Sequence, residues 1–148
     1  MLIKWPRKQG RGGPHIPPLR PSTEDPDLQV SFKLLDLRGN PKFGLHHCED
    51  GYLEKLLERF RDVNRMRVRE FRSSYTSAVR NHRIDFARMS EPKGFNLSEQ
   101  LLGEEFWQFE ITKSEHGRVH GMLIGEVFYV IWLDPCHRLY GGERNCHH

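Results

Sequence analysis

Two short segments of this chain alternate apolar and polar residues. LQVSFKLLDL, at 28–37, follows a proline-rich beginning, and WQFEITK, at 107–113, lies in the last third of the chain. A period of two is typical of a strand with one buried face. The sequence therefore predicts a strand in each segment, and shorter strands at 42–47 and at 82–86.

Between these segments, apolar residues recur with the spacing of α-helices. One helix is predicted from about residue 51 to 64, with Asp50 as its N-cap, and a second from about 67 to 81. Segment 91–105 is predicted to be a connecting loop with one helical turn. The apolar positions are Leu53, Leu56, Leu57, Phe60 and Val63 in the first helix and Val68, Phe71, Tyr75, Ala78 and Val79 in the second.

The most apolar part of the chain predicts a β-hairpin. RVHGMLI, at 118–124, and VFYVIWLD, at 127–134, flank a Gly-Glu pair at 125–126 that suits a two-residue type II′ turn. This turn would place His120 opposite Ile131. The full set of predicted pairs is Ile124–Val127, Met122–Tyr129, His120–Ile131 and Arg118–Leu133.

One face of this hairpin would be wholly apolar, and it is the natural seat for the two amphipathic helices. The predicted fold class is α+β, with two N-terminal helices packed on one face of a small, mainly antiparallel sheet whose other face is uncovered. A single domain is expected over 28–140. It would lie between a flexible, basic, Pro/Gly-rich arm at 1–27 and a flexible tail at 141–148.

Charge and cysteine content narrow the class of protein. The formal net charge is only +3, but segment 1–20 has basic and no acidic residues, and basic residues outnumber acidic ones over 51–90, so both zones would attract a polyanion. Three cysteines without a familiar spacing argue against a disulfide framework and for a reducing, cytoplasmic compartment. No apolar run approaches the roughly 20 residues that span a bilayer, and no signal-peptide pattern is found, so we expect no membrane insertion.

Polar side chains gather at one end of the predicted hairpin. Two lie on its mixed face, and others follow Asp134-Pro135, where proline ends the strand. Histidine or tyrosine can move protons, arginine can stabilise charge on a phosphate, and the 2′-hydroxyl of RNA can serve as nucleophile, so the group suits metal-free phosphodiester chemistry. The candidate catalytic residues are Arg118, His120, His137, Arg138 and Tyr140. A structural alternative pairs Arg118 with Asp134, bonds His120 to a carbonyl and lets Tyr140 cap the sheet edge.

The order of these patterns resembles the RelE/HigB/ParE superfamily of small bacterial toxins. The resemblance rests on a Trp-containing strand, an Arg-Val strand, an aliphatic strand ending in Asp, and a terminal polar cluster with Tyr. The matching residues are Trp107, Phe109, Ile111, Arg118, Val119, the run 128–133, Asp134, His137, Arg138 and Tyr140.

The resemblance implies a RelE-like toxin encoded in a bacterial or mobile-element genome. Such a protein would act as a metal-independent endoribonuclease on mRNA, including ribosome-bound mRNA, and would have an antitoxin or other protein partner. By the same resemblance, Arg118 would bind phosphate and His137 or Tyr140 would transfer a proton. ParE-type members of the fold are not ribonucleases, and a long basic arm is unusual for the superfamily.

The second hypothesis is a non-catalytic module that binds nucleic acid or protein on the same scaffold. Four arginines crowd the start of the second predicted helix, where a bound anion would offset their repulsion by the helix dipole. The predicted nucleic-acid-binding residues are Arg65, Arg67, Arg69, Arg72, His82 and Arg83. The histidines and cysteines match no familiar zinc spacing, so neither a metal site nor a cofactor is predicted.

Overall fold

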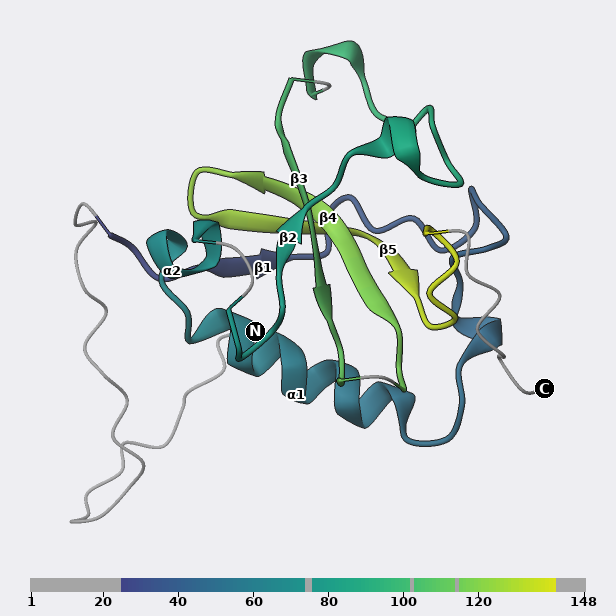
Figure 1. Ribbon diagram of the computed structural model, residues 1–148, viewed down its shortest axis with the longest axis horizontal. Coiled ribbons are helices and arrows are strands. Elements are labelled where there is room, and N and C mark those ends of the chain that lie inside the picture. The colour runs from purple at the N-terminus through teal and green to yellow at the C-terminus, as the bar shows by residue number, and fades with distance from the viewer. Residues whose placement is uncertain (1–24, 74–75, 102, 114, 141–148) are drawn as a thin grey trace, which may run out of the picture.

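The computed structural model describes residues 25–73, 76–101, 103–113 and 115–140. Its centre is a five-stranded sheet with the strand order β1-β5-β4-β3-β2 (Figure 1). The strands are β1 (Gln29–Ser31), β2 (His82–Arg83), β3 (Glu105–Glu110), β4 (Arg118–Ile124) and β5 (Val127–Asp134). The protein is therefore α+β, as predicted.

The sheet is mixed, which corrects the expectation of a mainly antiparallel sheet. β1 runs parallel to β5, whereas β2–β3, β3–β4 and β4–β5 are antiparallel. The parallel pair arises because the chain from β1 reaches the hairpin only after both helices and β2, and a long connection of this kind permits parallel pairing.

Two α-helices are described, α1 (Tyr52–Asn64) and α2 (Val68–Arg72). α1 agrees with the predicted range, but its N-cap is Gly51 and no side chain caps it, so the expected role of Asp50 is wrong. α2 ends after five residues instead of continuing to residue 81. The predicted strand at 42–47 is also wrong, since a 3₁₀ turn occupies Leu45–His47.

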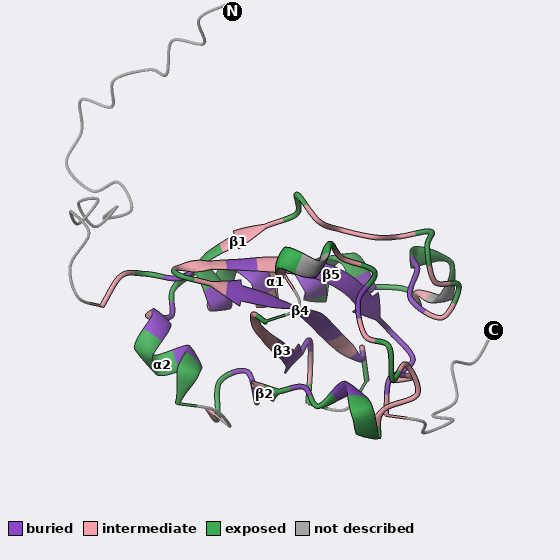
Figure 2. Ribbon diagram, turned by 90° about the horizontal axis from the view of Figure 1, so that it is seen from above, coloured by how far each residue is buried: buried purple, intermediate pink, exposed green. Residues whose placement is uncertain are grey.

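The larger hydrophobic core lies between the helices and one face of the sheet. Tyr52, Leu56, Phe60 and Val63 of α1 are buried at spacings of one helical face, while Leu53 and Leu57 are 63% and 57% exposed, contrary to their predicted place in the core. The sheet contributes its own buried residues to the same cluster, and buried stretches cover much of β4 and β5 (Figure 2). These sheet residues are Trp107, Phe109, Val119, Leu123, Phe128, Val130 and Leu133.

The opposite face of the sheet is covered too, which corrects the expectation of an uncovered face. A second cluster of buried apolar side chains packs there, and the residues that cover the sheet come from loops on both sides of the helices and from the C-terminal segment. Phe43 stacks on Trp132 with ring centroids 4.4 Å apart, and Phe95 meets the same indole edge-on at 4.7 Å. Near β2 and the ends of β3 and β4, this face opens to a pocket.

The hairpin register follows the prediction only as far as Gly121. Ile124 pairs with Val127 and Met122 with Tyr129, but a shift between His120 and Gly121 changes every later pair. His120 consequently faces Trp132, Val119 faces Leu133 and Arg118 faces Asp134. The irregularity turns Trp132 to the second face of the sheet, away from the predicted helix side.

The boundaries of the predicted arm and tail are only partly described. Residues 25–27 are predicted to be part of the arm, but they belong to the fold. Val68 N–H donates to the Pro26 carbonyl at 3.0 Å, and the backbones of Asp27 and Arg67 form an isolated antiparallel β-bridge. Segments 1–24 and 141–148 lie outside the described residues.

The structure also bears on the expectations about membrane insertion and about the cysteines. Neither described helix has the length and apolarity to cross a membrane. Cys48 is a free thiol, whereas Cys136 takes part in a disulfide bond, so the prediction of a reducing compartment gains no support from the cysteines.

Candidate active site

A pocket of about 240 Å³ opens on the second face of the sheet, beside the ends of β3 and β4. Its walls come from three parts of the chain: the segment that enters β2, the polar positions of β3 and β4, and the segment after β5. The lining residues are Arg80, His82, Gln108, Glu110, Arg118, His137 and Tyr140. Side chains distant in sequence thus converge on one small cavity.

Two of these residues have an unusual backbone. Arg80 (φ 48°) and His137 (φ 54°) are the two non-glycine residues with positive φ in the described part of the chain. Such a conformation costs of order 1–3 kcal/mol and persists only where surrounding structure enforces it. Both strained residues line the same pocket, and this coincidence marks the pocket as a candidate functional site.

The centre of the pocket is a carboxylate between two guanidinium groups. Glu110 Oε1 lies 2.7 Å from Arg118 Nη2, and Glu110 Oε2 lies 3.7 Å from Arg80 Nε. Glu110 faces Arg118 directly across β3 and β4, so the sheet register itself fixes the closer pair. Two positive charges against one negative charge leave the pocket suited to an anion.

His82 is held in one tautomer at the edge of the pocket. Its Nδ1 lies 2.9 Å from the Arg83 carbonyl, which can only accept, so Nδ1 carries the proton. Its Nε2 then accepts a hydrogen bond from the Gln108 amide. Burial lowers the pKa of His82 below its usual value, although the bond to Arg83 opposes this effect. Both ring nitrogens are therefore engaged within the protein.

Asp134 organises the segment that carries His137 and Tyr140. Its fully buried carboxylate accepts hydrogen bonds from His120 Nε2 at 3.0 Å, from Arg138 N–H at 2.8 Å and from Leu139 N–H at 3.0 Å. Burial alone would raise the pKa of Asp134, but the hydrogen bond and charge of His120, with the two backbone donors, outweigh burial and lower it. The carboxylate thus anchors the turn below β5.

The anchored turn brings two aromatic rings into the pocket. The His137 and Tyr140 rings stack with centroids 5.4 Å apart and planes at 16°. Tyr140 also meets His82 edge-on at 5.8 Å, so the C-terminal segment contacts β2. A stacked pair of this kind offers both a proton-transfer group and a flat surface for a nucleobase.

The structure brings together three of the five predicted catalytic residues. Arg118, His137 and Tyr140 line the pocket. His120 is fully buried against Asp134 and Phe43, so its predicted position on an open face is wrong. Arg138 is not among the residues that line the pocket.

The structural alternative, in which Arg118 pairs with Asp134 and His120 bonds to a carbonyl, is wrong in both partners. Arg118 pairs with Glu110, and Asp134 pairs with His120 rather than with Arg118.

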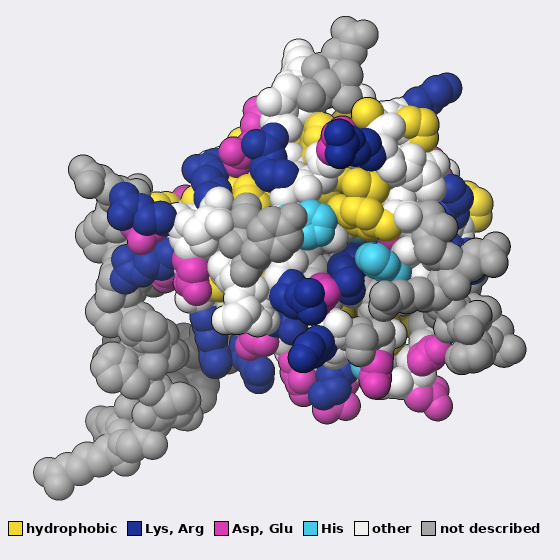
Figure 3. Space-filling view, viewed as in Figure 1, with side chains coloured by type: hydrophobic (Ala, Val, Ile, Leu, Met, Phe, Trp, Pro, Cys, Tyr) yellow, Lys and Arg dark blue, Asp and Glu magenta, His cyan; other side chains and the backbone are white. Residues whose placement is uncertain are grey.

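The predicted nucleic-acid-binding residues divide between two places. His82 belongs to the pocket, whereas Arg83 pairs with Trp107 in the sheet and lies 3.8 Å from Glu105. Arg72 meets the same Glu105 at 3.0 Å, and Arg67 meets Asp25 at 3.7 Å. On the face seen in Figure 3, basic and acidic side chains are likewise interspersed.

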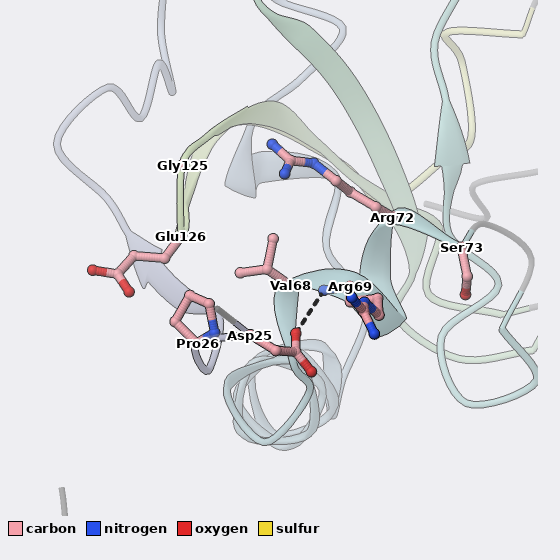
Figure 4. Close-up of a pocket in the computed structure, with 8 residues that line it drawn as sticks. All are labelled: Asp25, Pro26, Val68, Arg69, Arg72, Ser73, Gly125 and Glu126. Carbon is pink, nitrogen blue, oxygen red and sulfur yellow. Dashed lines mark hydrogen bonds between the residues drawn. The ribbon is translucent and has the colours of Figure 1, made fainter. Parts of the chain in front are cut away.

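A second, open depression of about 780 Å³ lies beside α2 (Figure 4). Arg69 and Arg72 of α2 line it, opposite the hairpin turn at 125–126. Asp25 and Glu126 line it as well, and Asp25 accepts a hydrogen bond from Arg69 N–H at 3.2 Å. This depression is therefore balanced in charge and has fewer groups for chemistry than the pocket.

Sequence reasoning missed three pocket residues, Arg80, Gln108 and Glu110. A signal for two of them was present, because Gln108 and Glu110 alternate with the apolar positions of WQFEITK and so share one face of β3. Pairing of β3 with β4 then places Glu110 beside Arg118. Arg80 carried no such signal, since its conformation depends on contacts made by the neighbouring loop.

The part of the chain that the structure describes contains no group of three or more histidine, cysteine or acidic side chains placed to hold a metal ion. Comparisons with protein-family models, with curated proteins and with solved structures found no match for this chain.

Proposed function

We propose that this pocket is the active site of a metal-independent endoribonuclease. The observation that carries the proposal is the convergence of a carboxylate, two guanidinium groups, two imidazoles and a phenol on one cavity of about 240 Å³. Cleavage of RNA by its own 2′-hydroxyl needs a proton acceptor, a group that stabilises the charged phosphorane and a proton donor to the leaving oxygen. The pocket supplies a residue for each role.

In the proposed reaction, Glu110 is the general base. Its carboxylate accepts the 2′-hydroxyl proton while the 2′-oxygen forms a bond to phosphorus. Arg118, 2.7 Å from Glu110, binds the phosphate oxygens as negative charge builds on them. The bond from phosphorus to the 5′-oxygen breaks, and that oxygen takes a proton from His137 or Tyr140. The products are a 2′,3′-cyclic phosphate and a 5′-hydroxyl.

His82 is not assigned a proton-transfer role in this reaction. Its Nδ1 donates to the Arg83 carbonyl and its Nε2 accepts from Gln108. Its proposed role is to support the Tyr140 ring, which it contacts edge-on.

The proposed biological setting is that of a RelE-like toxin in a bacterial or mobile-element genome, acting on mRNA and held in check by a protein partner. The order of one strand, two helices and an antiparallel β3-β4-β5 unit supports it, as does a polar segment with His137 and Tyr140 directly after the last strand.

The test is cleavage of free and ribosome-bound mRNA by the purified full chain in excess EDTA. We expect cleavage products with cyclic phosphate ends, and no cleavage where the 2′-hydroxyl is replaced by hydrogen. Arg118→Ala is expected to lower kcat/KM by about 10² to 10³-fold, the loss typical of removing one transition-state charge stabiliser. Intact RNA with the wild-type protein, or unchanged cleavage by an Arg118→Ala, His137→Ala double variant, would refute the proposal.

The alternative is a non-catalytic module that binds nucleic acid or protein through the α2 arginines. It is favoured by one observation, the open depression that Arg69 and Arg72 line. Such binding would weaken steeply with salt and with removal of residues 1–20. Expression in a bacterial host separates the two hypotheses: growth arrest abolished by Arg118→Ala favours the enzyme, and tolerated expression of the wild type favours the module.

A further inference from the structure

The two arginines of the pocket differ in how firmly the protein holds them. Arg118 is 13% exposed, and its guanidinium contacts Glu110 at 2.7 Å and the Gly117 carbonyl at 3.2 Å. Arg80 is 56% exposed, and its distance of 3.7 Å from Glu110 is longer than a hydrogen bond. The longer distance and the exposure of the Arg80 side chain make this ion pair weaker than the one between Glu110 and Arg118. Arg80 is thus poorly explained as a structural partner of Glu110.

The backbone around Arg80 is nevertheless held by several contacts. Its neighbours Val79 and Asn81 are buried, and its own N–H donates to the Thr76 carbonyl at 2.8 Å. Glu110 N–H in turn donates to the Val79 carbonyl at 3.0 Å. These contacts hold a bulky residue in a left-handed conformation and point an exposed guanidinium over the pocket. Conformational strain that serves no visible packing purpose is typical of a ligand-binding residue.

We propose that Arg80 binds a second phosphate, next to the scissile phosphate that Arg118 binds. This inference rests on the proposed ribonuclease activity and defines its substrate class as an oligoribonucleotide with a phosphate flanking the cleaved bond. One carboxylate cannot neutralise both guanidinium groups, so the pocket retains a positive charge after Arg118 has engaged Glu110. A flanking phosphate satisfies that charge by a charge-assisted contact at the pocket rim.

The experiment compares three short substrates with the full-length protein. The first is a dinucleoside monophosphate, which has only the scissile phosphate, and the others carry an additional 5′- or 3′-phosphate. We expect the wild type to cleave at least one of the latter with kcat/KM about tenfold higher, the size of one charged contact. Arg80→Gly should remove this preference, so that the variant cleaves the three substrates with similar kcat/KM.

Glycine is the appropriate replacement because it adopts positive φ without strain, so the variant should fold. Arg80→Lys should keep part of the preference, since the charge remains. Arg83→Ala is the matched control, because this nearby arginine pairs with Glu105 outside the pocket and should leave the preference unchanged.

The results separate this inference from the proposed function. Wild-type protein that cleaves all three substrates equally, or Arg80→Gly that lowers kcat/KM on all three by the same factor, would overturn the second phosphate site and leave the ribonuclease intact. Absence of cleavage of any RNA by the wild type would instead refute the proposed function.

Discussion

The two ends of β3 carry the same arrangement of charges in different surroundings. At one end Glu105 lies 3.0 Å from Arg72 and 3.8 Å from Arg83, and at the other Glu110 lies 2.7 Å from Arg118 and 3.7 Å from Arg80. The Glu105 side chain is 34% exposed and that of Glu110 is 7% exposed. Because the two residues are five positions apart, they lie on opposite faces of the strand.

This difference shows that ion pairing between a glutamate and two arginines is not sufficient to form a functional site. The Glu105 group is solvated, so its charges are screened and its ion pairs contribute about 1 kcal/mol or less. The Glu110 group lies in a cavity beside two histidines and a tyrosine, where charges interact more strongly and acid–base groups are within reach. A glutamate with two arginines is therefore expected to form only weak surface ion pairs at one end of β3 and to take part in a reaction at the other.

The largest expected effect comes from exchanging each glutamate for its neutral isostere. Glu110→Gln should lower kcat on RNA by about 10² to 10⁴-fold, because the proposed general base is lost while its shape is kept. Glu105→Gln, the matched control on the same strand, should cleave within about twofold of wild type. Steady-state cleavage in EDTA, with circular dichroism to verify folding, measures both. Equal losses in the two variants would contradict the contrast between the two ends.

Removal of the two carboxylates Asp134 and Asp25 should lower the free energy of unfolding by different amounts. Asp134→Ala would leave His120 and two backbone donors buried without their acceptor, so we expect a loss of about 3–5 kcal/mol in the free energy of unfolding. Asp25→Ala, which removes the partner of Arg67 beside α2, should cost about 1 kcal/mol or less. Urea denaturation measures both values. A small effect of Asp134→Ala would mean that the C-terminal turn has another anchor.

RNA binding should depend on the pocket more than on α2. In a salt titration with an uncleavable 2′-deoxy substrate, Arg118→Ala should reduce the slope of log K against log salt by about 0.7, the value for one lost contact to a single strand. Arg69→Ala should leave the slope unchanged, because its surroundings include Asp25 and Glu126. The reverse outcome would favour the binding-module hypothesis.

The smallest expected effect is a dependence of stability on pH. The folded pKa of His82 lies below the unfolded value of about 6.5, so the unfolded state binds more protons as pH falls. Stability should therefore be fully present above about pH 6.5 and should decrease as pH falls through the folded pKa. His82→Gln should lack this decrease, as measured by thermal unfolding between pH 7 and 5 in steps of about half a unit. An identical pH profile in both proteins would show that folding does not change the pKa of His82.

The sequence predicted the elements whose pattern is local. α1, β3 and the β4–β5 hairpin with its turn at 125–126 all occur close to their expected positions. It did not predict the end of α2, because the side chain of Asn81 accepts from Thr76 and donates to the Phe71 carbonyl, and this closes the loop that a longer helix would have occupied. That bond depends on a residue ten positions from its partner.

The hairpin register illustrates the same limit. The glycine-led turn fixed the pairs next to it, but packing of Trp132 against Phe43 and Phe95 on the second face accompanies a shift that no turn rule contains. This shift places Arg118 opposite Asp134 instead of Leu133.

By itself, the sequence determined an α+β protein and the gathering of Arg118, His137 and Tyr140 at one end of the sheet, since strand period, turn chemistry and chain order are local properties. Only the tertiary structure decided that Glu110 and Arg80 join them and that His120 is buried away from the pocket. The physical reason is that cross-strand pairing and left-handed backbone are enforced by contacts between distant segments. Such contacts determine which charges share a cavity and which meet solvent.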